Sequence, residues 1–417
     1  MIRLLEDLGK KAVMAKYELQ VLSQEKKREA LLLAAEGLEA DMTAILAANE
    51  LDMQAGREHG MHIGLLDRLH LDEGRIRAMA EGLRQIAGLP DPVGRTLDTW
   101  ERPNGLCLKK VSVPLGVIGI IYESRPNVTA DAFALCFQAG NAVILKGGSD
   151  AIHSNLAITK SLRGSLEQAG VTADAIQLIA ATDRETAAAF MRCHEYIDVL
   201  IPRGSAGLIR AAVENSTIPI IETGTGNCHI FIDETARLTE SVNIVINAKT
   251  QRIGVCNACE SLVIHKKIAD AFLPLLQKKI QEVHEVEIRG DEKVCDILEQ
   301  ASPASETDYA TEYLDYILSA VTVESVEEAI AHINRYSTHH SDAILTENRE
   351  NAEKFTREVD SACVYVNAST RFTDGFMFGF GGEIGISTQK LHARGPMGLN
   401  ELTTYKYVIT GNGQVRE

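Results

Sequence analysis

Short, largely apolar segments recur about twenty residues apart in the middle of this chain, and they constrain its fold more than any other feature. Both faces of each segment are apolar, unlike the alternating pattern of a strand with one face in water. Helix-like stretches separate the segments, which predicts βαβ units around a buried parallel sheet. The segments are Val117–Ile121, Ala142–Leu145, Ile176–Ala180, Val199–Ile201 and Ile218–Ile221.

The pattern restarts after Asn227, where a second group of apolar segments alternates with helical stretches such as Val326–Asn334. The expected fold class is therefore α/β, with two domains that each contain a sheet rich in parallel strands. The length of 417 residues agrees, because one hydrophobic core rarely serves more than about 250–300 residues. The second group consists of His229–Ile232, Leu262–Ile264, Ile317–Val323, Ala343–Leu345 and Cys363–Val366.

The remaining segments lie at the two ends of the chain. The first hundred residues predict helices, with apolar residues at helical spacing and Gly56 as a stop. Thr403–Thr410 alternates like an antiparallel strand, and Leu106–Val113 is a second strand outside both α/β units. We expect these two strands to form a small arm that packs on another subunit of a homo-oligomer. The helical spacing is that of Leu38, Met42, Ile45 and Leu46.

Charge and cysteine content narrow the function classes. Asp and Glu total 58 against 42 Lys and Arg, for a formal net charge of −16. Nucleic acid and anionic membranes are excluded as partners because both require a basic surface. Any anionic substrate would need the few basic residues to be concentrated locally. The early acids Glu6 and Asp7 argue against a targeting peptide, and eight scattered cysteines fit a reducing compartment, so a cytoplasmic location is expected.

Cys256 is the first candidate for chemistry. It follows the helix-like stretch Ser241–Thr250 and lies in a turn that contains Gly254 and Asn257. An exposed cysteine in such a turn can act as a nucleophile, with backbone N–H groups nearby for an oxyanion. A buried structural cysteine is the simpler alternative. A redox or zinc pair with Cys259 is another, but zinc needs further ligands at suitable spacing, so no metal is expected.

Three turns after predicted strands are candidates for binding a cofactor. The segment Glu222–His229 contains Gly224, and ligands of α/β sheets gather at such strand ends. Lys146 precedes two glycines and Ser149, while Gly204 and Ser205 stand in a similar turn before a helix, where phosphate can bind. A simple βα turn explains each segment equally well. No G-x-G-x-x-G motif opens a helix after the first strand.

Arginines and a glycine-rich stretch complete the candidates. Arg125, Arg252, Arg371 and Arg394 lie in turn-rich contexts where an anion could be clamped, although solvated surface arginines are the simpler interpretation. Gly375–Gly385 alone indicates a flexible loop.

Taken together, these segments resemble the aldehyde dehydrogenase superfamily, and most closely its branch that reduces acyl phosphates. The resemblance covers nearly the whole chain in unbroken order, and its longest specific stretch is Phe378–Gly398. The other matching stretches are Val113–Gly119, Tyr122–Val128, Gly140–Gly148, Glu222–His229, Asn247–Asn257 and Val366–Phe372.

The resemblance implies a three-part architecture. A dinucleotide-binding domain would comprise residues 1–98 and 115–227, and a catalytic domain residues 228–394. Residues 99–114 and 395–417 would form the oligomerisation arm.

The resemblance also implies roles for individual residues. Cys256 matches the thiol nucleophile, and Lys146 the lysine that contacts the adenosine ribose. Gly204 and Ser205 match the helix start near the pyrophosphate, with Gly224 beside the cofactor. Glu312 matches the glutamate that holds the nicotinamide ribose.

The sequence departs from the hydrolytic members of the superfamily. Glu123–Pro126 replaces their asparagine-containing stretch, so Asn127 or Ser124 would share the role of oxyanion donor. Glu222 aligns with the base that activates water for deacylation, a step that a phosphate-releasing reductase does not need.

The implied activity is reduction of L-glutamyl 5-phosphate to L-glutamate 5-semialdehyde by NADPH, through a Cys256 thioester, in proline biosynthesis. Arg125, Arg252 and Arg371 are the candidates for binding the anionic substrate. Another acylating or hydrolytic aldehyde dehydrogenase is the alternative within enzymes. A non-catalytic partner of glutamate kinase is the alternative outside them, and glutamate kinase is also a possible partner of an active enzyme.

Overall fold

The computed structural model describes residues 2–416, which fold into two compact units. The first consists of residues 2–223, 379–385 and 397–416. The second consists of Gly224–Phe378 and Ile386–Pro396. No helix among the described residues is long and apolar enough to cross a membrane.

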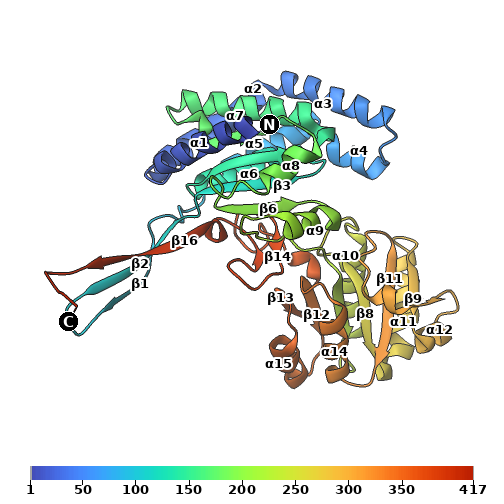
Figure 1. Ribbon diagram of the computed structural model, residues 1–417. Helices are drawn as coiled ribbons and strands as arrows, with labels where there is room; N and C mark the ends of the chain where they lie inside the picture. Colours follow the sequence, from blue (N-terminus) through green and yellow to red (C-terminus); the bar gives the residue numbers. More distant parts are fainter. Residues whose placement is uncertain (1, 417) are drawn as a thin grey trace. The chain divides into compact units, whose positions relative to one another are not determined.

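The first unit is built on a four-stranded parallel sheet in the order β5-β4-β3-β6. Figure 1 labels β3 and β6 of this sheet. Every residue of β3 and β4 is buried, as expected for a sheet covered on both faces. The segment Ile218–Ile221, predicted as a further strand, makes only one bridge between Ile220 and Leu200, so that prediction was wrong. The strands are β3 (Val117–Tyr122), β4 (Ala142–Gly147), β5 (Ile176–Leu178) and β6 (Val199–Arg203).

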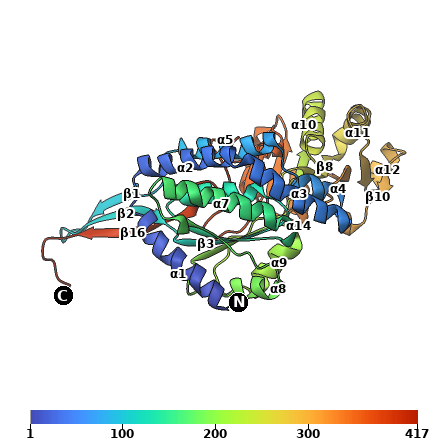
Figure 2. The ribbon, with the colours of Figure 1, turned by 90° about the horizontal axis from the view of Figure 1, so that it is seen from above.

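Helices cover both faces of this sheet. Figure 2 shows α2, α5 and α7 on one side of β3, with α1, α8 and α9 on the other. The helices are α1 (Ile2–Leu19), α2 (Gln24–Ala40), α3 (Met42–Glu58), α4 (Ile63–Leu69), α5 (Glu73–Ala87), α6 (Asn127–Gln138), α7 (Ile152–Gln168), α8 (Arg184–Phe190) and α9 (Ala206–Asn215).

The helical prediction for the first hundred residues is confirmed, with one correction. Gly56 does not end a helix, because α3 continues to Glu58. Gly56 is buried, and a Cβ there would lie 3.1 Å from Leu66 Cδ2 of α4. Gly56 is therefore a close-packing position between α3 and α4 rather than a helix stop.

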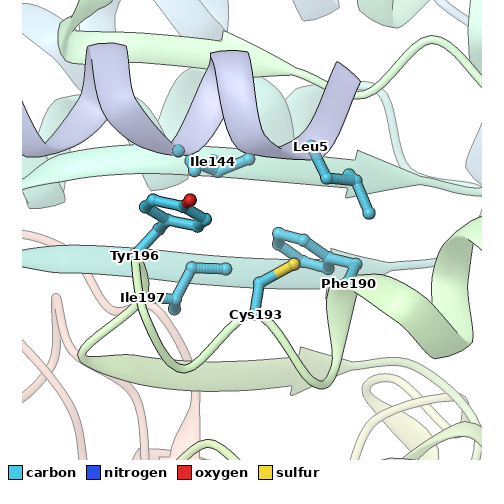
Figure 3. A pocket seen from close by; sticks show the side chains of 7 residues that line it. Leu5, Ile144, Phe190, Cys193, Tyr196 and Ile197 are labelled. Atoms are coloured by element: carbon cyan, nitrogen blue, oxygen red, sulfur yellow. The ribbon is translucent and has the colours of Figure 1, made fainter. Parts of the chain in front are cut away.

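A small pocket lies between α1 and the sheet (Figure 3). Its lining is almost entirely apolar, and Cys193 is its one sulfur-bearing residue. The space within it is about 10 Å³, which is at the lower limit of what holds one water molecule. It is a packing void rather than a ligand site. The lining residues are Leu5, Gly9, Ile144, Phe190, Cys193, Tyr196 and Ile197.

Three antiparallel strands form a separate small sheet in the order β1-β2-β16. The two predicted outlying strands pair with each other here, from Thr403 opposite Pro114 to Thr410 opposite Cys107. Seven of the eight residues of β16 are exposed, including Tyr407 and Ile409. The strands are β1 (Thr96–Glu101), β2 (Cys107–Pro114) and β16 (Thr403–Thr410).

The second unit contains a seven-stranded parallel sheet in the order β10-β9-β11-β8-β7-β12-β13. All residues of β7, β8 and β12 are buried, which confirms the second α/β unit. The strands are β7 (Cys228–Ile232), β8 (Cys259–His265), β9 (Glu287–Gly290), β10 (Ser302–Pro303), β11 (Ile317–Val323), β12 (Ser341–Leu345) and β13 (Cys363–Val366), with a two-stranded ribbon β14 (Ile386–Ser387) and β15 (Gly395–Pro396).

Helices pack on both faces of this larger sheet, where two apolar clusters form the core. Phe272 of α11 belongs to one cluster and Phe355 of α15 to the other. The helices are α10 (Leu238–Thr250), α11 (Lys266–Gln281), α12 (Glu292–Ile297), α13 (Glu306–Tyr309), α14 (Val326–Tyr336) and α15 (Arg349–Glu358).

Candidate active site

Cys256 lies in the loop that joins the C-terminus of α10 to the amino end of β8. It is half-buried, whereas its neighbours Asn257, Ala258 and Cys259 are buried. Cys256 is therefore the sulfur of this loop that solvent or a small molecule can reach.

The alternative of a redox or metal pair finds no support in the surroundings of Cys259. Burial raises the pKa of Cys259 to about 12, so this thiol stays protonated at neutral pH. Its Sγ donates to the backbone oxygen of Ser261 at 3.5 Å. Among residues 2–416, no group of three or more His, Cys, Asp or Glu side chains is placed to hold a metal ion.

Contacts from distant segments hold the backbone of the Cys256 loop. The thiol of Cys228, at the start of β7, donates to the backbone oxygen of Cys256 at 3.1 Å. The hydroxyl of Thr370 donates to the backbone oxygen of Asn257 at 2.8 Å. The Asn257 side-chain amide donates to the backbone oxygen of Thr373 at 2.8 Å. The loop is therefore anchored at two consecutive residues.

Two arginines bring positive charge to this loop. Arg371 is half-buried, and its Nε donates to Gln251 Oε1 at 3.0 Å. Burial lowers the pKa of Arg371, and the nearby positive charge of Arg252 lowers it further, while Cys256 acts in the opposite direction. Cys256, Arg252 and Arg371 are thus close enough to interact electrostatically. An anionic group bound beside Cys256 would relieve the repulsion between the two arginines.

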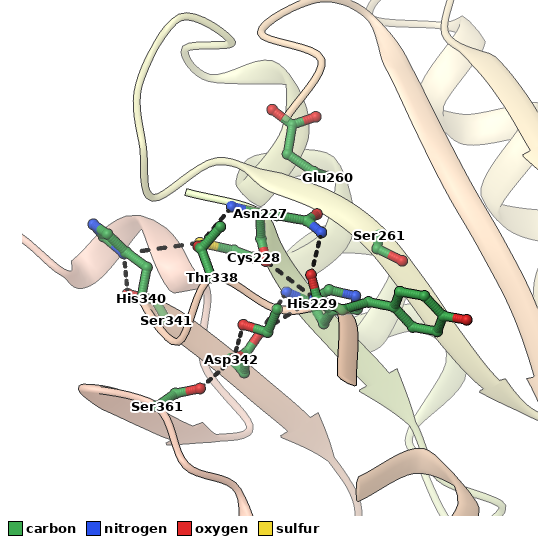
Figure 4. Close-up of polar contacts among 12 residues, drawn as sticks. Asn227, Cys228, His229, Glu260, Ser261, Thr338, His340, Ser341, Asp342 and Ser361 are labelled. Carbon is green, nitrogen blue, oxygen red and sulfur yellow. Dashed lines mark hydrogen bonds and ion pairs between the residues drawn. The ribbon is translucent and has the colours of Figure 1, made fainter. Parts of the chain in front are cut away.

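Behind the loop, the buried carboxylate of Asp342 in β12 links several segments (Figure 4). It accepts hydrogen bonds from the backbone N–H of His229 at 2.7 Å and from Ser337 Oγ at 2.7 Å. Ser361 Oγ makes a further short contact with it. Burial alone would raise the pKa of Asp342, yet the His229 imidazole, 3.5 Å away, and then the two serine hydroxyls hold it below the ordinary value. An ionised Asp342 therefore fixes the start of β7, which carries Cys228.

Two more carboxylates support the same loop. Glu312 Oε1 accepts the backbone N–H of Gly226 at 2.7 Å. Glu260 and Lys249 form an ion pair of 2.6 Å with both side chains fully buried. Lys249 belongs to the last turn of α10 and Glu260 to β8, so this pair joins the two elements that flank the Cys256 loop.

In the first unit, the candidate cofactor site lies where the strand order reverses. β3 is flanked by β4 on one side and β6 on the other, which makes the carboxyl ends of β3 and β6 the topological switch point of the sheet. Glu123 follows β3, and its carboxylate accepts the N–H of Ser205 at 2.7 Å and the Ser205 hydroxyl at 3.0 Å. Ser205 caps α9 by accepting the N–H of Leu208 at 3.3 Å.

This arrangement fits a dinucleotide cofactor. The start of α9 offers N–H groups to an anion, and here it already accommodates a carboxylate. Gly204 permits the approach, because a Cβ at this position would lie 2.5 Å from Glu123 Oε2. Lys146, at the end of β4, donates to the backbone oxygen of Gly147 at 3.1 Å, and burial lowers its pKa.

The remaining predicted residues of the first unit lie in the segment after β3 and at the end of the unit. Asn127 is the first residue of α6, and its side-chain amide donates to Asp131 Oδ2 at 2.9 Å. Ser124 has a φ of 34° and contacts the carboxylate of Asp150. Arg125 and Glu222 are both half-buried.

The structure therefore brings together two groups of predicted residues, one in each unit. Cys256, Arg252 and Arg371 share one loop region, and Gly224 and Glu312 belong to the same unit. The predicted residues Lys146, Gly204 and Ser205 lie at the strand ends of the first unit. Arg394, a candidate anion clamp, instead pairs with Asp360 at 2.9 Å.

Sequence reasoning missed the residues that position the loop. Cys228 and Thr370 lie in the matching stretches Glu222–His229 and Val366–Phe372, but no role was predicted for either, and their roles come from long-range contacts. Gly226 had one signal, its place in the G-x-G of Glu222–His229. A Cβ at Gly226 would lie 1.4 Å from the backbone oxygen of Cys256, so this glycine is required for the packing.

Comparison with known proteins adds a family and close relatives. The model of the aldehyde dehydrogenase family matches residues 6–295 and 297–408. A gamma-glutamyl phosphate reductase of Moorella thermoacetica is 58% identical over 98% of both chains. One of Enterococcus faecalis is 54% identical over 99% of both.

Solved structures agree with these matches. A gamma-glutamyl phosphate reductase of Thermotoga maritima has a TM-score of 0.97 at 49% identity, and the match covers 99% of this chain and 100% of the other. An acetylating aldehyde dehydrogenase of Geobacillus thermoglucosidasius has a TM-score of 0.70 at 17% identity, over 100% of this chain and 98% of the other. The second comparison shows a shared fold.

Proposed function

The chain belongs to the aldehyde dehydrogenase family, in its gamma-glutamyl phosphate reductase branch, and we propose that it reduces L-glutamyl 5-phosphate to L-glutamate 5-semialdehyde in proline biosynthesis. Phosphate is released, and NADPH is the hydride donor. The observation that carries this proposal is the likeness to curated reductases of that name along almost the entire chain.

Cys256 is the nucleophile of the proposed reaction. Its thiolate attacks the γ-carbonyl carbon, and the bond from that carbon to the phosphate oxygen breaks as inorganic phosphate leaves. An acyl phosphate has a higher group-transfer potential than a thioester, so this transfer is downhill. NADPH supplies the hydride that reduces the thioester carbonyl. The resulting thiohemiacetal collapses to the aldehyde and returns the thiolate of Cys256.

The charge of the second unit suits this substrate. Glutamyl phosphate carries a phosphate and an α-carboxylate, whereas the chain has a formal net charge of −16. Arg252 and Arg371 concentrate positive charge beside Cys256, and we assign them to substrate binding. Arg125 is our third candidate. Asn127 is proposed as an oxyanion donor, while Glu222 has no required step, since phosphate leaves without a water molecule being activated.

The residues assigned to the nicotinamide cofactor are those that the family resemblance and the strand-end turns point to. Lys146 would bind the adenosine ribose, and Gly204 with Ser205 the pyrophosphate. Gly224 would lie beside the cofactor, and Glu312 would hold the nicotinamide ribose. The carboxylate on the α9 N-terminus supports the pyrophosphate assignment, because that N-terminus already accepts an anionic group.

We further propose that residues 1–98 and 115–227 form the dinucleotide-binding domain, residues 228–394 the catalytic domain, and residues 99–114 with 395–417 an oligomerisation arm. The exposed apolar residues Tyr407, Val408 and Ile409 of β16 support homo-oligomer formation through this arm. We also propose a cytoplasmic location, and glutamate kinase, whose product is the proposed substrate, as a candidate partner.

The test of the proposed function is the reverse reaction. Glutamate 5-semialdehyde and NADP⁺ are supplied with phosphate, and the absorbance of NADPH is followed in wild type and in Cys256→Ser. We expect activity that requires phosphate and falls more than about a hundredfold in Cys256→Ser. Cys259→Ser, which changes the neighbouring buried thiol, is the matched control. Turnover without phosphate would identify a hydrolytic enzyme instead. A Cys256→Ser variant that keeps more than about a hundredth of the wild-type rate would refute covalent catalysis at this position.

A further inference from the structure

Attack of Cys256 on a carbonyl creates an oxyanion that needs a hydrogen-bond donor already in place. A backbone N–H is an effective donor only if its peptide plane is held in one orientation. The contacts around residues 256 and 257 provide such a restraint, and they reach the loop from β7 and from the segment after β13.

The first restraint acts on the backbone oxygen of Cys256. Cys228 is fully buried, and its Sγ lies 3.1 Å from this oxygen. Burial raises the pKa of Cys228 well above the ordinary value, so the thiol keeps the proton that it donates. Gly226 packs against the same oxygen, because a Cβ at residue 226 would lie 1.4 Å from it. The carbonyl of Cys256 is therefore directed into the interior of the unit.

The second restraint acts on the next residue. The Thr370 hydroxyl donates to the backbone oxygen of Asn257 at 2.8 Å, and the Asn257 side chain donates to Thr373 at 2.8 Å. The N–H of Ala258 is also engaged, donating to the backbone oxygen of Val255 at 3.1 Å. Rotation of the 256–257 peptide would break contacts on both sides of it.

The orientation of the peptide N–H follows from planarity. Every peptide bond among the described residues is trans, and in a trans peptide the carbonyl and the N–H point in opposite directions. With the Cys256 oxygen directed toward Cys228, the Asn257 N–H points away from the buried interior. No hydrogen-bond acceptor for this N–H occurs among residues 2–416.

We propose that the backbone N–H of Asn257 is an oxyanion donor for the tetrahedral intermediate at Cys256, and that Cys228 is the positioning residue that orients this peptide through the Cys256 oxygen. The inference rests on the proposed function, since it takes Cys256 as the nucleophile. It gives Cys228 a role in catalysis without contact with the substrate.

The test separates reactions at Cys256 that form an oxyanion from those that do not. p-Nitrophenyl acetate acylates a thiolate through a tetrahedral oxyanion, whereas iodoacetamide alkylates it by direct displacement. Both probes work without cofactor or natural substrate. Single-turnover rates are measured with each probe on wild type, Cys228→Ala, Cys228→Ser and Thr370→Val. Cys259→Ala is the control, because its thiol bonds Ser261 and not the loop.

We expect Cys228→Ala to slow acylation by about tenfold or more, a fraction of the roughly 10²–10³ lost when a whole donor is removed. Alkylation by iodoacetamide should stay within twofold of wild type. Cys228→Ser, which keeps a donor, should restore most of the acylation rate, and Cys259→Ala should leave both rates unchanged. Thr370→Val should show the same selective loss and serves as the test if Cys228→Ala does not fold.

Two results would overturn the proposal. One is an acylation rate within twofold of wild type in both Cys228→Ala and Thr370→Val. The other is a parallel fall of acylation and alkylation, which would indicate general disorder of the loop. The proposed function can fail separately. If the wild type reacts normally with both probes but does not turn over semialdehyde with NADP⁺ and phosphate, the proposed function is refuted and this test remains valid.

Discussion

Replacing Lys249 by Met should strongly destabilise the second unit, because it leaves the carboxylate of Glu260 buried without its partner. The two side chains are fully buried and 2.6 Å apart. The Glu260 carboxylate also accepts the N–H of Leu314 at 3.3 Å. Met has nearly the volume of the lysine stem, so the variant removes the charge with little change in packing.

The magnitude follows from the burial of both groups. Removing one partner of a fully buried ion pair lowers the free energy of unfolding by about 3–5 kcal/mol. At about 2–4 °C per kcal/mol for a domain of this size, the melting temperature should fall by roughly 10 °C. A double variant that combines Lys249→Met with Glu260→Gln has no unpaired charge in the interior. The double variant should therefore recover most of the loss.

The destabilisation should also depend on pH. Burial raises the pKa of Glu260 to about 7 even with Lys249 beside it, and loss of the lysine should raise it further. When folding raises the pKa of a carboxyl group, the folded protein is most stable at pH below the pKa of that group in the unfolded chain. This stability is lost as the pH rises through the pKa of the group in the folded protein. Lys249→Met should therefore cost more at pH 8.5 than at pH 5.5.

Thermal unfolding followed by circular dichroism at these two pH values measures both effects. Lys293→Met is a matched control, because it removes an exposed lysine paired with Asp270 at 2.7 Å, and exposed pairs contribute only about 0–1 kcal/mol. The reasoning is refuted if Lys249→Met loses less than about 1 kcal/mol at pH 8.5, or if its cost is independent of pH.

Two other predictions test a buried histidine and the α9 N-terminus. Burial lowers the pKa of His340 to about 4. The unfolded chain binds the proton more readily, so the folded state should lose about 2 kcal/mol as pH falls from 7.5 to 5. His340→Gln should flatten this dependence in urea unfolding at pH 7.5 and 5, and an unchanged pH slope would contradict it. Glu123→Gln should bind NADPH several-fold more tightly in a fluorescence titration. The reason is that the negative charge beside Ser205, which repels the pyrophosphate at the α9 N-terminus, is removed. Equal or weaker binding would show that Glu123 does not compete with the cofactor.

Much of the fold could be predicted from local sequence patterns. The segments Val117–Ile121, Ala142–Leu145 and Cys363–Val366 form strands β3, β4 and β13, because parallel strands covered on both faces require apolar residues in succession. Thr403–Thr410 forms β16, as its alternation predicted. The two errors were a strand predicted from apolar residues and a helix end predicted from a glycine, and in both cases the residue type serves packing instead. Ile218–Ile221 is apolar because it packs near the sheet edge, with only one bridge to it, and Gly56 is small because α4 packs against it.

For the candidate site, too, the sequence predicted one part and left another part undetermined. The sequence by itself singled out Cys256, because its loop follows a helix and precedes an apolar strand, and because the surrounding residues resemble a family with a nucleophile there. It also pointed to arginines as the means by which an acidic chain binds an anion. These inferences depend on neighbours along the chain, which a sequence displays directly.

Only the tertiary structure decided what holds that loop. Cys228 is 28 residues away from its partner Cys256, and Thr370 is 113 residues away from its partner Asn257. Both contacts arise from the order in which the strands pair. Hydrogen bonds act over about 3 Å whatever the separation along the chain. Their partners are therefore set by strand order and register, which local composition does not reveal.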